Sequence, residues 1–138
     1  MLIRFCYSAY WLLVMLCRLL VVRLTNRKLR IYLAVPYTGS DKYSMDEVEH
    51  IVSSVAGSLM EYYVVFSPIT HGHAIASTGY VSDRSWEFWR EQCLPYIDMA
   101  DKMYILCLPG WDTSVGVLAE KEIAIRQHKE IAYIGEEL

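Results

Sequence analysis

The sequence contains little glycine and proline, and paired cysteines are missing. Only 7 Gly and 4 Pro occur among 138 residues, which excludes collagen-like and low-complexity chains. Because 54% of the residues are hydrophobic and 21% are charged, intrinsic disorder is excluded as well. A chain of this length corresponds to one compact domain with a sizeable core.

The cysteines show no CxxC or other paired spacing; they are Cys6, Cys17, Cys93 and Cys107. This pattern predicts reduced, mostly buried thiols in a cytoplasmic protein, rather than a disulfide framework or a zinc site. The His-Gly-His segment at residues 71–73 has no carboxylate beside it and falls short of a metal site. We therefore expect no metal and no cofactor.

Acidic residues are absent from the first thirty positions. Residues 1–30 carry six Lys or Arg, a charge of +6, whereas residues 31–138 carry seven against sixteen Asp or Glu, a charge of −9, which together give the net charge of −3. An acidic domain disfavours a broad nucleic-acid surface, so we expect no nucleic-acid partner.

Residues 1–28 form a basic, apolar leader. Residues 5–22 are apolar except for Arg18, and eighteen residues are the lower limit for a bilayer span. An Arg at the centre of a spanning helix costs about 2.5–3.5 kcal/mol. Two interpretations stay open: membrane contact through residues 5–22, with the domain in the cytosol, or a segment that does not span. The latter includes an in-plane helix, a helix packed on the domain, and upstream sequence added by a wrong start codon.

Residues 29–138 alternate between short apolar strand patterns and helical patterns. Strands are predicted at residues 29–36, 63–67, 103–108 and 131–134. Helices are predicted from Ser44 to about residue 62, from Ser85 to about residue 92, from Pro95 to about residue 100, and from Ser114 to about residue 129, with a loop at 69–83. The alternation predicts an α/β fold: a flavodoxin- or Rossmann-like three-layer sandwich with a parallel sheet of about four strands.

Ligands of such folds bind beyond the carboxyl ends of the strands, and the segment after the third strand is the most informative. Ser114 is expected to cap a helix whose free first-turn N–H groups could hold an anion. Glu120 lies four residues after Gly116, so both share one helix face, and Gly116 leaves room over the Glu120 carboxylate. The alternative is that Glu120 is an ordinary solvated helix charge.

Several motifs lie in order along the domain: IYLAVPY at the first strand, FSPITH after the second, Ala100-Asp101 opening the third, and LPGW followed by S-x-G-x-x-x-E at its exit. Together, over residues 29–134, they resemble the nucleoside 2-deoxyribosyltransferase-like superfamily. The resemblance implies retaining chemistry at an N-glycosidic bond. Glu120 would attack the anomeric carbon of a (deoxy)ribosyl group, the base would depart, and water or another base would resolve the intermediate.

The resemblance also bears on the substrate. At position 114 the nucleoside transferases carry an Asp that binds the sugar 5′-hydroxyl, whereas the 2′-deoxynucleoside 5′-monophosphate N-hydrolases carry a Ser that donates to phosphate. Ser114 therefore favours a nucleotide, because a carboxylate would repel phosphate. The other substrate-binding residues that we expect are Tyr32, Tyr37, Thr38, Gly39, Ser67, His71, His73, Trp111 and Gly116.

At the position of the residue that protonates the leaving base, this sequence differs from the family pattern. The position of the family's acid corresponds to Cys93, and a thiol substitutes poorly for a carboxylic acid. Asp98 and Asp112 are our candidates beside Glu120, and the two histidines of the 71–73 segment are alternatives.

The aromatic residues of the predicted third helix and of the following loop have different expected roles. Trp86 and Trp89 lie three residues apart on the helix and are expected in the core or in a lid rather than in a stacking platform. Trp111, in the loop before Ser114, is expected to touch a ligand.

The sequence thus favours an N-glycosidic bond hydrolase that acts on a (deoxy)nucleoside 5′-monophosphate through Glu120, expected from the resemblance to be a homodimer. Two alternatives stay open. One is a nucleoside deoxyribosyltransferase. The other is a non-catalytic nucleotide-binding or signalling module, which the thiol at Cys93 would suit.

Overall fold

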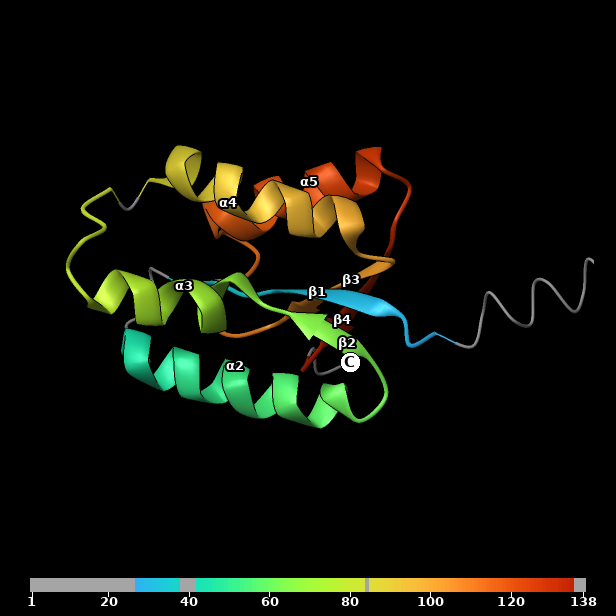
Figure 1. Ribbon diagram of the computed structural model, residues 1–138, viewed down its shortest axis with the longest axis horizontal. Coiled ribbons are helices and arrows are strands. Elements are labelled where there is room, and N and C mark those ends of the chain that lie inside the picture. The colour runs from blue at the N-terminus through green and yellow to red at the C-terminus, as the bar shows by residue number, and fades with distance from the viewer. Residues whose placement is uncertain (1–26, 38–41, 84, 136–138) are drawn as a thin grey trace, which may run out of the picture.

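The computed structural model of the protein describes residues 27–37, 42–83 and 85–135 (Figure 1). The membrane contact expected through residues 5–22 and the expected binding residues Thr38 and Gly39 lie outside these ranges. Within them, no helix combines the length and the apolar character needed to cross a bilayer.

A parallel sheet forms the middle layer. Its strands are β1 (Arg30–Ala34), β2 (Val64–Phe66), β3 (Lys102–Leu106) and β4 (Glu130–Ile134), in the spatial order β2-β1-β3-β4. Tyr32 of β1 is paired with Phe66 of β2 and with Met103 of β3. This order is that of flavodoxin-like sheets, in which strand order reverses between β1 and β3. The predicted α/β fold class is confirmed.

Helices cover both faces of the sheet (Figure 1): α2 (Met45–Met60) and α3 (Pro68–Ser77) lie on one, and α4 (Trp86–Met99) and α5 (Val115–Arg126) on the other. Successive side chains of a strand point to opposite faces. Leu33 therefore packs in the core beneath α2 and α3, whereas Tyr32 packs in the core beneath α4 and α5.

Three helices begin at their predicted caps. Ser44 and Glu47 form the capping box: each accepts a hydrogen bond from the other's backbone N–H group. The Ser85 and Ser114 hydroxyls cap α4 and α5, respectively. Each accepts a hydrogen bond from the backbone N–H group of the residue three positions later in the sequence. These caps place the positive ends of the helices at the carboxyl edge of the sheet.

The prediction of a loop at residues 69–83 is wrong for its first half, which is α3. Pro68 occupies the first turn, where its missing N–H group would have no partner in the helix. Ile69, Gly72 and Ala76 are buried along one face of α3. Two of these three residues are small, so the apolar periodicity of the segment is weak and only packing against the sheet makes it a helix.

The predicted break before Pro95 is also wrong, because α4 continues through this residue to Met99. Proline removes one hydrogen bond and disfavours a helix interior. Cys93 and Ile97, on either side of it, are both buried in the core, so tertiary packing outweighs the local penalty.

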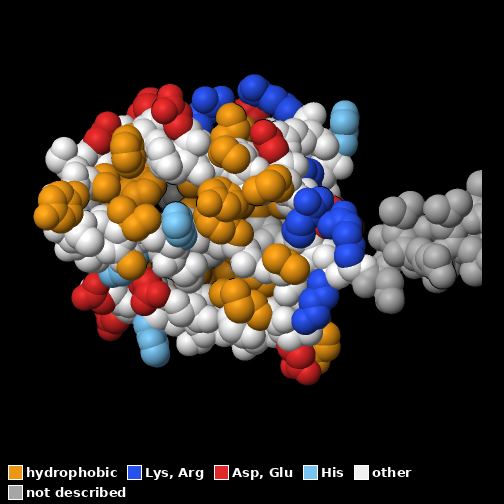
Figure 2. Space-filling model, viewed as in Figure 1, with side chains coloured by type: hydrophobic (Ala, Val, Ile, Leu, Met, Phe, Trp, Pro, Cys, Tyr) orange, Lys and Arg blue, Asp and Glu red, His pale blue; other side chains and the backbone are white. Residues whose placement is uncertain are grey.

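Basic side chains gather where the described chain enters β1 (Figure 2). Arg27 and Arg30 both pair there with Asp101, and Lys102 pairs with Glu130. All of these residues lie at or just before the beginnings of strands. The carboxyl edge of the sheet, where ligands are expected, is the opposite one.

Candidate functional site

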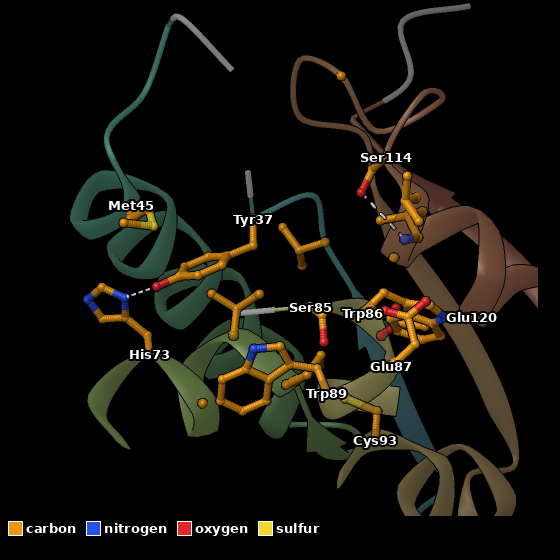
Figure 3. A pocket seen from close by; sticks show the side chains of 18 of the residues that line it. Tyr37, Met45, His73, Ser85, Trp86, Glu87, Trp89, Cys93, Ser114 and Glu120 are labelled. Carbon is orange, nitrogen blue, oxygen red and sulfur yellow. Dashed lines mark hydrogen bonds between the residues drawn. The ribbon is translucent and has the colours of Figure 1, made fainter. Parts of the chain in front are cut away.

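A cavity of about 770 Å³ opens at the carboxyl edge of the sheet (Figure 3). Its lining comes from the segments that follow β1 and β3 and from the amino-terminal parts of α2, α3, α4 and α5. Pockets for small organic ligands have volumes of about 300–1,000 Å³. The cavity lies where the parallel sheet predicts a ligand site.

Glu120 lies on α5 and lines this cavity, although the residue is only 4% exposed. Its Oε1 atom accepts a hydrogen bond of 2.6 Å from Tyr32 Oη. Burial raises the pKa of Glu120 to about 7, and the hydrogen bond from Tyr32 partly opposes this rise. Glu120 is therefore not a solvated helix charge but a carboxyl that can change its protonation state near neutral pH, a property typical of catalytic groups.

Tyr32 and Cys93 complete the surroundings of this carboxyl. Tyr32 is fully buried, and burial raises its pKa well above the usual range, with a further contribution from the Glu120 charge. Burial also raises the pKa of Cys93 to about 11, and the Glu120 charge adds to the effect. Both groups therefore remain protonated at neutral pH, so Glu120 is the one member of the three that ionises there.

The first turn of α5 forms the wall beside Glu120. Ser114, Val115, Gly116 and Val117 all line the cavity, and the Ser114 hydroxyl accepts the Val117 N–H group. The first N–H groups of a helix have no acceptor within it, so this turn can offer donors to an anion, as predicted. Among the described lining residues there is no Lys or Arg, so such donors would have to hold a phosphate.

The space over Gly116 is not open. A Cβ atom at this position would lie 3.7 Å from the Trp86 ring, in ordinary van der Waals contact. Trp86 of α4 thus faces Gly116, and both residues line the cavity together with Glu120.

Trp86 and Trp89 form an aromatic wall that the sequence did not assign to the binding site. Both are half-buried and line the cavity. Gly72 of α3 permits the approach of Trp89, because a Cβ atom there would lie 3.1 Å from the indole ring. The signal that could have found this wall is the position of both tryptophans in the first turns of a helix that begins at the carboxyl edge. The other lining residues that we did not expect include Met45 and Glu87.

Two of the residues expected to bind substrate, His73 and Tyr37, lie in the wall of the cavity formed by α3 and the segment after β1. His73 Nδ1 and Tyr37 Oη share a hydrogen bond of 2.5 Å (Figure 3), and His73 Nε2 lies 3.0 Å from Asp46 Oδ1. His73 thus joins α3 to the end of β1 and to the first turn of α2.

The structure does not bring the two predicted acids to the cavity. Asp98 is exposed near the end of α4, at the opposite edge of the sheet, where it accepts a 2.5 Å hydrogen bond from Gln127 Nε2. Asp112 is exposed in the loop before α5 and is not among the lining residues. Asp98 is likewise not among the lining residues of the cavity.

Four predicted binding residues also lie outside the lining. One is Tyr32, which is fully buried and reaches the site through its hydrogen bond to Glu120. Trp111 packs against Tyr133, with ring centroids 5.3 Å apart, and does not line the cavity. His71 is exposed, with its ring 5.8 Å from that of Phe66. Ser67 is buried between β2 and α3, and its hydroxyl has no hydrogen-bond partner within the described part of the chain.

No three His, Cys, Asp or Glu side chains are grouped as metal ligands within residues 27–37, 42–83 and 85–135.

The fold and site define a class: a flavodoxin-like α/β protein with a buried, titratable carboxyl in a cavity at the carboxyl edge of its sheet. Residues 29–136 match the family described as "Domain of unknown function (DUF1937)", and the chain belongs to this family.

One solved structure similar to this chain comes from the characterisation of a 2-deoxyribosyltransferase from the psychrotolerant bacterium Bacillus psychrosaccharolyticus. The match covers 79% of this chain and 76% of that chain, with a TM-score of 0.53 and 23% identity. The protein therefore has a 2-deoxyribosyltransferase-like fold. No curated protein matches the sequence.

Proposed function

We propose that the protein cleaves the N-glycosidic bond of a nucleoside or nucleoside 5′-monophosphate, with Glu120 as the nucleophile. The observation that carries this proposal is the buried Glu120 carboxyl, which faces a cavity of about 770 Å³ and has a pKa of about 7. Oε1 is hydrogen-bonded to Tyr32, so the other carboxylate oxygen is available to attack the anomeric carbon. The attack would form a glycosyl ester and release the base.

The aromatic wall supports binding of the base. Trp86, Trp89 and Tyr37 all line the cavity, together with Met45. Flat heteroaromatic rings stack well on such side chains, and each stacked base contributes about 1–3 kcal/mol. If the base stacks on this wall, its sugar would point towards α5 and Glu120.

The fate of the sugar distinguishes two reactions. Water as the acceptor would give a hydrolase, and a second base would give a deoxyribosyltransferase. The fold shared with a 2-deoxyribosyltransferase favours transfer. Ser114 and the first turn of α5 favour a substrate with a 5′-phosphate, because helix N-terminal N–H groups bind anions.

The test is incubation of the purified full-length protein with 2′-deoxynucleosides and their 5′-monophosphates, with and without a second free base. Chromatography would follow the released base and any new nucleoside. We expect Glu120→Gln to lower base release by at least about 10³-fold. Glu122→Gln, an exposed position on the same helix, is the matched control and should keep the activity.

A product that carries the second base would establish transfer, and release of base alone would establish hydrolysis. Binding without turnover, unchanged by Glu120→Gln, would contradict the proposal and favour a non-catalytic nucleotide-binding module. The expected homodimer also remains a proposal, for which light scattering on the same preparation is the measurement.

A further inference from the structure

We infer that Glu87, in the first turn of α4, donates the proton to the departing base; this inference rests on the proposed function. Among the described residues that line the cavity, Glu87 and Glu120 are the two carboxylates. They come from different helices, and no sequence motif connects them. Their presence in one cavity follows from the packing of α4 on α5.

Local structure explains how Glu87 reaches this position. Ser85 caps α4 at the carboxyl edge of the sheet, so the next two residues lie in the first turn. Trp86 faces Gly116 of α5, which is one turn before Glu120. Glu87 follows Trp86 directly and lines the same cavity (Figure 3).

The other proton donors near the cavity are less suitable. Cys93 has a pKa of about 11, so its thiol is a weak acid. Both ring nitrogens of His73 have partners, Tyr37 and Asp46. Glu87, by contrast, has no hydrogen-bond or ion-pair partner within the described part of the chain, and its exposure lets it exchange protons with solvent.

The proposed steps are those of paired carboxyl groups. A Glu120 carboxylate oxygen bonds to the anomeric carbon while the carbon–nitrogen bond breaks and its electron pair passes to the base. Glu87, when protonated, gives its proton to that base. Glu87, now a carboxylate, then takes a proton from water or from the N–H group of a second base, which attacks the anomeric carbon. The ester bond breaks, the Glu120 carboxylate is regenerated, and Glu87 is again neutral.

This role predicts a dependence on the leaving group, which a structural role would not produce. The base of 2′-deoxyguanosine needs a proton to leave as a neutral molecule. The base of 7-methyl-2′-deoxyguanosine carries a positive charge and leaves without one. General acid catalysis contributes about 10²–10⁴-fold. Glu87→Gln should therefore lower kcat/KM for 2′-deoxyguanosine by about 10²-fold or more, and that for the methylated nucleoside by less than about threefold.

The experiment compares the two nucleosides in the wild-type protein, Glu87→Gln, Glu120→Gln and the control Glu91→Gln, after subtraction of uncatalysed release. Glu91 is exposed one turn further along α4 and does not line the cavity, so its variant should keep both activities. Glu120→Gln should lose both. If Glu87→Gln loses kcat/KM equally for the two nucleosides, the assignment of Glu87 as proton donor would be overturned, but the proposed function would not. A wild-type protein that releases no base from 2′-deoxynucleosides or from their 5′-monophosphates would instead count against the proposed function.

Discussion

The carboxyl of Glu120 experiences two opposing influences, and their balance sets its chemistry. Burial favours the neutral form, whereas the hydrogen bond from Tyr32 favours the charged form. The resulting pKa of about 7 means that Glu120 is ionised in an appreciable fraction of the molecules at neutral pH. In the proposed reaction, activity should rise with pH through this value.

The first prediction concerns Tyr32→Phe, which removes the hydroxyl and leaves the ring in the core. Without the hydrogen bond the pKa of Glu120 should rise further, so the acidic limb of the pH profile of kcat/KM should move above pH 7. Each unit of that movement lowers activity at pH 7 by about tenfold.

Tyr96→Phe is the control for this substitution, because Tyr96 stacks on Phe66 and does not line the cavity. An acidic limb that stays in place in Tyr32→Phe would show that the hydrogen bond does not set the titration of the nucleophile.

Among the elements, the first turn of α5 both contains the helix cap and forms part of the cavity wall. Ser114 caps the helix and also lines the cavity. Asp is as good a cap as Ser, so a change to Asp alters the charge at this position while it preserves the helix.

The second prediction is that Ser114→Asp lowers kcat/KM for a 5′-monophosphate more than that for the corresponding nucleoside, because the carboxylate repels phosphate. Steady-state kinetics on a matched pair of substrates is the measurement. Equal losses on both would exclude a phosphate site at this helix terminus.

The third prediction compares two helical glycines. Gly57 of α2 is exposed, and a Cβ atom there meets nothing within 4 Å. Gly57→Ala should therefore increase the free energy of unfolding by about 0.5–1 kcal/mol, since alanine favours the helix. At Gly72 the added Cβ atom would lie 3.1 Å from Trp89, so the indole ring must shift.

Gly72→Ala should thus be less stabilising than Gly57→Ala, and the tryptophan fluorescence spectrum should change only in the former. Urea unfolding of both variants measures the difference. An equal gain in stability at the two positions would show that Trp89 is not held against α3.

For the whole molecule, the buried Glu120 should make stability depend on pH. The pKa of Glu120 in the folded protein, about 7, exceeds the ordinary glutamate value of 4.5, so the folded state binds more protons between these values. Stability should therefore fall as pH rises from about 5 to about 8, by about 3 kcal/mol at most. Asp101 affects stability outside this pH window. Hydrogen bonds from Arg30, and to a smaller extent from Arg27, hold the pKa of Asp101 far below its usual range, so its contribution to stability is lost only in acid.

The fourth prediction follows from this sign. Urea titration at pH 5 and at pH 8 measures the unfolding free energies of Glu120→Gln and of the wild type. The value for Glu120→Gln minus the value for the wild type should increase from pH 5 to pH 8. A difference that is the same at both pH values would mean that Glu120 titrates as an exposed carboxyl does.

The sequence by itself determined the strands, three helix caps and the order of α/β units, and through them the edge of the sheet at which a ligand site lies. These features depend on apolar periodicity and on hydrogen bonds between residues three apart, both of which are local. For the same reason the position of Gly116 and Glu120 on one face of α5 could be predicted from a single helix.

Only the tertiary structure decided which other side chains face the cavity. It brought Trp86, Trp89 and Glu87 into the lining, turned Trp111 towards Tyr133, and placed Asp98 at the far end of α4. These outcomes depend on how α3, α4 and α5 pack on the sheet. Such packing joins residues far apart in the sequence, and no local pattern encodes it.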